Sequence, residues 1–213
     1  MKSYLLKFLL ILNISFINAT CPVINSVPNF NLTEYIKDKW YIQKQQETFY
    51  LPLNSNYCVT AEYKISNTIK IPFYSGTVLS VYNHANLNNV SGGQLNRNNY
   101  TLCARIPNSS NPSKLLVGQC FLPNFLSGDY WVVDVGPKSY NYQWAVVIGG
   151  QPTQEYKDGC TTKINSINGA GLWIFSRNQT ISNELMKNIL DNISKLGISV
   201  SQLNNVLQKN CVY

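Results

Sequence analysis

The sequence predicts an all-β fold, an antiparallel barrel or sandwich, followed by one amphipathic helix. Eight extended segments rich in Val, Ile, Tyr and Trp follow one another at short, hairpin-like spacing. No helical pattern interrupts them, whereas a parallel α/β sheet would place helices between its strands. The period of the apolar residues changes only after residue 177.

The predicted strands span residues 39–46, 57–66, 77–82, 100–106, 114–122, 128–135, 143–148 and 172–177. Residues 67–75 can extend the hairpin that starts with the second strand. Residues 84–97 read as a long loop or hairpin end that contains His84, and residues 149–171 as a polar loop. The loop at residues 47–56 carries Phe49 and Tyr50, and apolar residues on a loop pack beneath it or cover a ligand.

Trp40 lies where a helical turn becomes the first strand. Leu32, Tyr35 and Ile36 share one side of this turn, and Trp40 and Ile42 share one face of the strand that follows. A single large aromatic at this junction predicts a common floor for the strands.

The chain after the strands predicts a helix that packs against the outside of the sheet. Its apolar stripe recurs every three and four residues, and Ser182 can cap its start and Gly197 end it. A shorter helix is expected next, opened by Ser199 and Gln202 as a capping box. The stripe consists of Ile181, Leu185, Met186, Ile189, Leu190, Ile193 and Leu196.

Residues 1–19 are typical of a secretory signal peptide, which leaves one domain at 20–213. Lys2 and Lys7 give a positive start, residues 8–16 are apolar, and Ala19 is a small residue at the expected cut. The apolar run is about half of a membrane span, which argues against a stable membrane anchor. We therefore expect a secreted, extracellular protein.

The six cysteines all follow the expected cut, and an even number in an exported chain predicts three disulfides. His84 is the only histidine and no Cys-x-x-Cys pair occurs, so neither a metal site nor a cofactor is expected. The formal net charge of +7 comes from scattered residues, and this spacing argues against nucleic acid as a partner. Asn-x-Ser/Thr sequons, which are candidate glycosylation sites, occur at Asn31, Asn89, Asn99, Asn108, Asn178 and Asn192.

The ordered set of segments resembles the lipocalin family, most closely its apolipoprotein D and bilin-binding branch. Residues 31–44, NLTEYIKDKWYIQK, resemble the first motif, and 57–63, YCVTAEY, resemble the second strand with its cysteine. Residues 129–134, DYWVVD, and 142–147, YQWAVV, resemble the strands around the middle motif, and 172–177, LWIFSR, the last motif. The chain departs from the family at Asp38, where Gly is usual, and in the loop at 134–140.

The resemblance implies an eight-stranded antiparallel up-and-down barrel with one closed end, an open mouth and a C-terminal α-helix packed outside. It also implies that Arg177 stacks on Trp40 at the closed end. The disulfide pairs that it implies are Cys21–Cys160 and Cys58–Cys211. The two remaining cysteines, Cys103 and Cys120, lie symmetrically about the turn near Asn111, where a cross-strand bridge can form. This set is a hypothesis, because six cysteines allow 15 pairings.

The leading hypothesis is a secreted protein that carries or sequesters a small hydrophobic ligand inside the barrel, such as a lipid, retinoid or bilin. Alternation from Trp40 predicts inward-facing candidates, and Phe49 and Tyr50 are expected at the mouth. A slip of one residue in a strand would turn its candidate outward. The inward candidates are Ile42, Tyr63, Tyr82, Tyr130, Val132, Trp144 and Val146.

Two other functions compete with the carrier. A secreted interaction or structural protein would have a barrel filled by its tyrosines and would act through its loops. A lipid isomerase on this fold would need an unpaired, activated cysteine, and all six cysteines here can be paired. The leading prediction is therefore not an enzyme. The sequence gives no indication of a receptor or of self-association.

Overall fold

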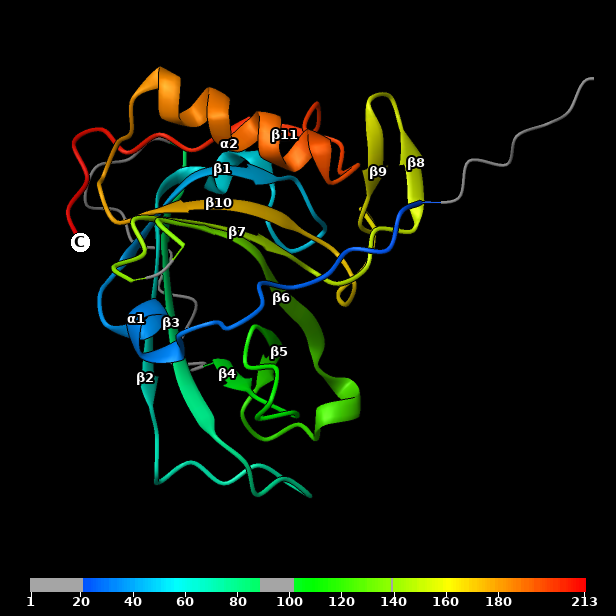
Figure 1. Cartoon of the computed structure of the whole chain (residues 1–213). Coiled ribbons are helices and arrows are strands. Elements are labelled where there is room, and N and C mark those ends of the chain that lie inside the picture. Colours follow the sequence, from blue (N-terminus) through cyan, green and yellow to red (C-terminus); the bar gives the residue numbers. More distant parts are fainter. Residues whose placement is uncertain (1–20, 89–101, 139) are drawn as a thin grey trace, which may run out of the picture.

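The backbone forms a closed antiparallel barrel with one long helix on its outside (Figure 1). The computed structural model describes residues 21–88, 102–138 and 140–213, so the expected signal peptide lies outside the described residues. The elements in chain order are α1 (Leu32–Ile36), β1 (Trp40–Gln46), η1 (Leu53–Ser55), β2 (Tyr57–Ile65), β3 (Val78–Asn86), β4 (Leu102–Arg105), β5 (Lys114–Gln119), η2 (Asn124–Leu126), β6 (Gly128–Gly136), β7 (Trp144–Ile148), β8 (Gln154–Tyr156), β9 (Gly159–Thr161), β10 (Leu172–Ser176), α2 (Asn183–Lys195) and β11 (Leu203–Asn205).

The pairing of β10 with β1 closes the sheet. From β1 to β7 each strand pairs antiparallel with the next along the chain, and β10 pairs with both β7 and β1. The predicted eight-stranded barrel is thus confirmed, and the sandwich alternative is wrong. No helix in the part of the chain that the structure describes is long and apolar enough to cross a membrane.

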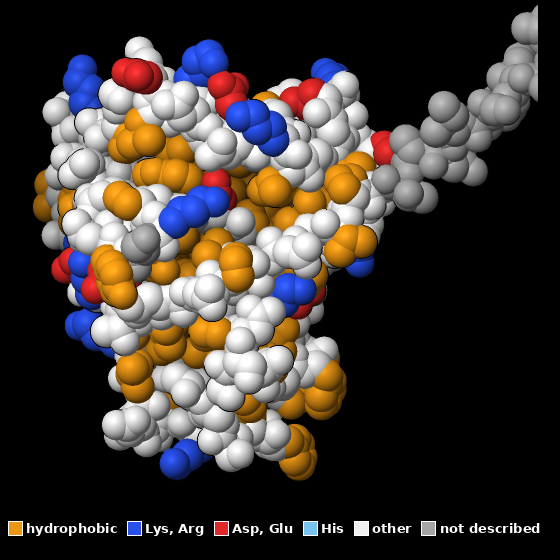
Figure 2. Space-filling view, in the orientation of Figure 1, with side chains coloured by type: hydrophobic (Ala, Val, Ile, Leu, Met, Phe, Trp, Pro, Cys, Tyr) orange, Lys and Arg blue, Asp and Glu red, His pale blue; other side chains and the backbone are white. Residues whose placement is uncertain are grey.

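Strands β6, β7 and β10 are apolar on both faces. Their inward residues join the core of the barrel, and their outward residues join a second core beneath α2. Ile189 and Ile193 of α2 are fully buried in this second core, and the Ser182 hydroxyl caps the helix by accepting from the Leu185 N–H at 3.1 Å. Figure 2 shows charged side chains along the upper edge, where α2 runs, and hydrophobic ones gathered beneath it.

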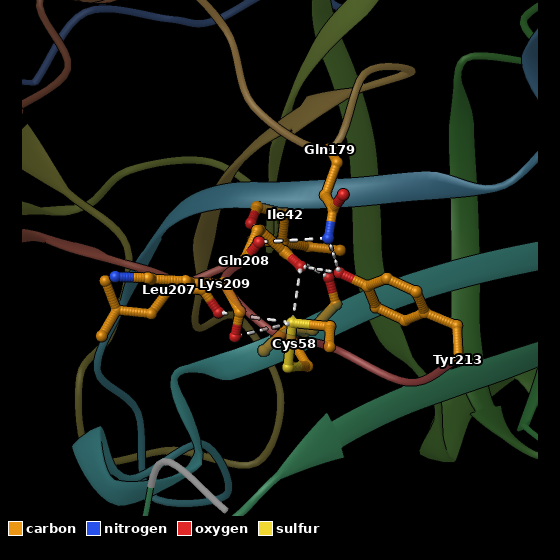
Figure 3. Close-up of a disulfide and its surroundings, with 9 residues drawn as sticks. Ile42, Cys58, Gln179, Leu207, Gln208, Lys209 and Tyr213 are labelled. Carbon is orange, nitrogen blue, oxygen red and sulfur yellow. Dashed lines mark hydrogen bonds between the residues drawn. A yellow bond between two sulfur atoms is a disulfide. The ribbon is translucent and has the colours of Figure 1, made fainter. Parts of the chain in front are cut away.

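The C-terminal segment forms part of the barrel wall. β1 pairs with β2 only at Trp40 and Tyr41, and farther along the same edge β1 pairs with β11. Leu207 then forms a parallel bridge with Tyr57 of β2. The Gln208 side chain donates at 2.8 Å to the carbonyl oxygens of both Ile42 and Val59 (Figure 3). This segment therefore spans the gap that opens between β1 and β2.

The three disulfides are Cys21–Cys160 and Cys58–Cys211, the two pairs that the lipocalin resemblance implies, and Cys103–Cys120, the expected cross-strand bridge. Two of them hold chain segments that lie far apart in the sequence, with separations of 139 and 153 residues. The second attaches the C-terminal segment to β2, next to the Gln208 contacts (Figure 3).

The predicted helix opened by Ser199 and Gln202 is wrong. The Asp158 carboxylate, from the β8–β9 turn, accepts from the Val200 and Ser201 N–H groups at 3.1 and 3.0 Å. It also accepts from the hydroxyls of Ser199 and Ser201. Gln202 instead donates its side-chain amide to Thr161. The chain leaves this turn as β11 because the edge of β1 is available for pairing.

The placement of His84 in a polar loop is also wrong. β3 extends to Asn86, and His84 is a buried strand residue whose ring lies 6.0 Å from the ring of Tyr213. Burial lowers the pKa of His84 below its usual value. His84 is buried because Tyr213 of the C-terminal segment packs against it, whereas Tyr82 on the same face of β3 is exposed.

Two loop predictions need smaller corrections. The polar stretch at 149–171 contains a hairpin, β8 and β9, which Cys160 attaches to the N-terminal segment. Residues 67–75 do not lengthen β2 and β3; they form a turn with a single bridge between Ile71 and Tyr74.

Arg177 closes the end of the barrel opposite the mouth. Its guanidinium carbon lies 3.5 Å from the centroid of the Trp40 ring, and its Nη2 donates to the Glu34 and Tyr35 carbonyl oxygens, each at 2.8 Å. It also donates to the carbonyl oxygen of Asp38. Asp38 stands where lipocalins usually have Gly, and its backbone therefore helps to hold Arg177 in place. Burial lowers the pKa of Arg177 to about 10, which leaves it charged at neutral pH.

Replacing Arg177 by Lys should lower the free energy of unfolding by about 2–4 kcal/mol. A lysine keeps the charge but loses the planar stack and most of the hydrogen bonds to carbonyl oxygens. Urea unfolding followed by circular dichroism measures the loss, and Lys64→Ala, at an exposed position of β2, is the control. A variant as stable as the parent protein would show that the stack does not hold the closed end.

Candidate functional site

The candidate site is the interior of the barrel. The lower half of this interior, at the closed end beside Trp40, is filled by aromatic side chains. Trp40, Tyr35 and Tyr142 are at most 1% exposed. The Trp40 ring N–H donates to the Tyr35 carbonyl oxygen at 2.9 Å. α1 places Tyr35 there because Asn31 caps the helix at its first turn.

Three phenol groups meet in the middle of the barrel. The Tyr130 hydroxyl oxygen lies 2.6 Å from that of Tyr35 and 2.7 Å from that of Tyr63. Burial raises the pKa of Tyr63 to about 12 and those of Tyr35 and Tyr130 well above the usual value. The three groups are therefore neutral hydrogen-bonding hydroxyls at physiological pH, and they form a polar floor within an apolar wall.

The upper half of the interior lies between the three phenols and the mouth. Its side chains are less deeply buried than those of the lower half. Ala85, Leu102, Val117 and Trp173 pack against the inner core but remain partly exposed. All four lie near the strand ends that face away from Arg177. The Trp173 ring stacks on Tyr130 with centroids 6.5 Å apart, so it stands directly above the floor. These four side chains form the less deeply buried part of the inner wall.

Four of the predicted inward residues lie in the inner core: Ile42, Tyr63, Tyr130 and Val132. On β1 and β2 the inward face alternates with a more polar face, so the period of two identified the inward side of Ile42 and Tyr63. On β6, which is apolar on both faces, the period does not separate the two faces. The neighbouring residues Tyr35 and Trp173 were not among the predicted site residues. Trp173 shares the alternation of Phe175, which faces inward, and this signal could have identified it.

Three predicted inward residues are wrong. Tyr82 is 54% exposed, because Leu79 and Val81 are the inward residues of β3. Trp144 and Val146 lie in the outer core beneath α2, and Ala145 and Val147 face inward instead. A bulge between Val132 and Asp134 shifts the register against β7, and the apolar residues on both faces hid this shift.

The two predicted mouth residues, Phe49 and Tyr50, differ in how far they are exposed to solvent. Phe49 is 75% exposed, whereas Tyr50 is partly buried and donates its hydroxyl to the Ala170 carbonyl oxygen at 2.9 Å. Tyr50 thereby ties the β1–β2 loop to the loop before β10. Both residues lie at the end of β1 opposite Trp40, as expected for the mouth.

The described residues show no feature of a thiol-based active site. All six cysteines are in disulfides. Within residues 21–88, 102–138 and 140–213, no group of three His, Cys, Asp or Glu side chains could hold a metal ion.

Comparison with known structures identifies the fold. Apocrustacyanin C2 superposes with a TM-score of 0.54 at 14% sequence identity, over 90% of this chain and 92% of that protein. The cockroach allergen Per a 4 gives 0.54 at 13% identity, over 88% and 94%, and insecticyanin from the tobacco hornworm Manduca sexta gives 0.51 at 18%, over 87% and 85%. The chain has the lipocalin fold. No protein-family model and no curated protein sequence matches it.

Replacing Tyr130 by Phe should lower the free energy of unfolding by about 1–3 kcal/mol. The change removes the central hydroxyl and leaves the buried Tyr35 and Tyr63 hydroxyls without it. Urea unfolding measures the loss, with Tyr82→Phe on the exposed face of β3 as the matched control. If Tyr130→Phe were as stable as Tyr82→Phe, the hydrogen bonds of Tyr130 to Tyr35 and Tyr63 would not stabilise the barrel.

Proposed function

We propose that this protein is a secreted lipocalin of the apolipoprotein D and bilin-binding branch. In this proposal it carries or sequesters a small hydrophobic molecule, such as a lipid, retinoid or bilin. The observation that carries the proposal is the difference between the two halves of the barrel: the lower half is filled, while Ala85, Leu102, Val117 and Trp173 remain partly exposed inside the upper half. Apolar walls with a few polar groups are typical of small-molecule sites.

The ligand would lie against Trp173, above the three phenols. Covering partly exposed apolar side chains is favourable by about 25 cal/mol per Å². The floor limits how deeply the ligand enters, so its far end would lie near the mouth loops. The structurally similar apocrustacyanin C2 is described as an apoprotein, the term for a protein without its bound group. This description supports a carrier role by analogy.

Secretion is supported by the three disulfides, which persist in oxidising compartments. Of the sequons, Asn108 and Asn178 are exposed and are the sites that we propose to be glycosylated. The Asn31 side chain caps α1, and the Asn192 side-chain amide donates to Asp134 at 3.3 Å, so these two are less available. Asn89 and Asn99 lie outside the described residues.

An interaction protein with a filled barrel is the second candidate. The phenol floor supports it, and so do the apolar side chains that the mouth loops expose, among them Phe121 at 63% and Phe125 at 79%. Such a protein would bind partners through these loops and take up no small molecule. Catalysis is not proposed, because the thiol chemistry known on this fold needs an unpaired cysteine.

Hydrophobic ligands should quench the intrinsic fluorescence of the protein through Trp173. Retinol, a fatty acid and a bilin form the test panel, each titrated into the parent protein. Trp173→Phe should lose most of the response, while Trp131→Phe should keep it, because Trp131 packs beneath α2 on the outer face.

Two outcomes would contradict the carrier role. The first is no response to any member of the panel. The second is an equal response of the two tryptophan variants, which would place the bound molecule outside the barrel.

A further inference from the structure

Gln45 is a polar side chain on the inner wall of the upper half of the barrel. In the register of β1 and β10, Ile42 pairs with the inward-facing Phe175, and Gln45 pairs with Trp173. On its other side Gln45 pairs with Asn204 of β11, two residues before the inward-facing Val206. Residues paired directly across an antiparallel ladder share a face, so Gln45 lies beside Trp173 inside the barrel.

One end of the Gln45 amide has no hydrogen-bond partner. The side chain is 1% exposed, and its Nε2 donates to Asn56 Oδ1 at 2.6 Å. Its Oε1 is buried and accepts no hydrogen bond from the described residues. Buried acceptors are nearly always paired, because an unpaired one keeps its desolvation cost.

Buried charges lie elsewhere in the barrel. The described charged side chains that are buried are Arg105 and Asp134. Arg105 shares the outward face of Cys103 and donates to the Gln119 and Leu122 carbonyl oxygens at 2.8 and 2.7 Å, and Asp134 accepts from Asn192 of the outer helix. Neither charge can pair with a ligand beside Trp173. Among the described residues, no buried cation lies beside Trp173 to compensate the desolvation of a carboxylate that enters this half.

We propose that Gln45, held in place by Asn56, is a ligand-binding residue that accepts a hydrogen bond from the ligand. This inference rests on the proposed carrier function and specifies its ligand class. The ligand is an uncharged amphiphile: a hydrophobic body that covers Trp173, with one hydroxyl or N–H group that donates to Gln45 Oε1. Neutral alcohols and amides fit this site, and free carboxylates do not.

Three retinoids with the same hydrophobic body separate these classes: retinol has a hydroxyl donor, retinyl methyl ether has none, and retinoate is an anion. Dissociation constants come from the quenching of tryptophan fluorescence. The parent protein should bind retinol roughly 2- to 10-fold more tightly than the ether, the ratio that one net hydrogen bond supplies. Retinoate should bind more weakly than retinol.

Gln45→Met should bring the ratio of retinol to ether affinity close to one while both still bind. Gln46→Met is the matched control, because Gln46 is equally buried but hydrogen-bonds to Thr161 and Thr162. It should keep the ratio of the parent protein. Circular dichroism establishes that each variant is folded, and the parent's own ratio tests the proposal without any variant.

The outcomes distinguish the two proposals. Quenching by all three retinoids with a parent ratio near one, or the same ratio in Gln45→Met as in the parent, would overturn the role of Gln45 and leave the carrier function standing. The role of Gln45 would also be overturned if Gln46→Met brought the ratio of retinol to ether affinity as close to one as Gln45→Met does. A general structural effect of either substitution would then explain the result. Absence of quenching by any retinoid would count against both proposals.

Discussion

The stack of Arg177 on Trp40 is the interaction on which the rest of the barrel depends. The guanidinium, at the end of β10, joins two segments that lie far from it and from each other in the sequence: the α1–β1 junction through the carbonyl oxygens of Glu34, Tyr35 and Asp38, and the segment before β7 through the Tyr142 carbonyl oxygen. Each contact is to a backbone carbonyl oxygen and so depends little on the neighbouring side chains. The β1–β10 pairing that closes the sheet begins beside this stack.

Closure at this end determines where a ligand can bind. Tyr35 reaches the centre of the barrel because α1 is held over Trp40, and its hydroxyl completes the floor with Tyr63 and Tyr130. The lower half of the barrel is thus given to packing. Among the described residues, the wall near the mouth brings the partly exposed Trp173 together with the unpaired Gln45 Oε1. In the proposed carrier, stability and binding therefore use different halves of one interior.

Local patterns were sufficient to predict an antiparallel barrel or sandwich, and the resemblance of the ordered motifs to the lipocalin family predicted the barrel and its closed end. Tyr63 lies on a strand whose alternation gave the correct inward side. Trp144 and Val146 were misplaced since α2 buries the outer face of β7 as well, and alternation cannot separate two apolar faces. His84 and Ser199 were misplaced because their environments come from distant segments, the C-terminal tail and Asp158. Such contacts leave no local pattern.

The central claim is that the upper half of the barrel holds a small molecule. Native mass spectrometry of the protein, purified from culture medium without denaturation, tests this claim most directly. If this half holds a ligand, the spectrum contains a second species, heavier than the protein by the mass of one small molecule, that disappears after organic extraction and yields an uncharged amphiphile in the extract. A single species with the same mass before and after extraction, together with an extract that contains no such molecule, would overturn the carrier role.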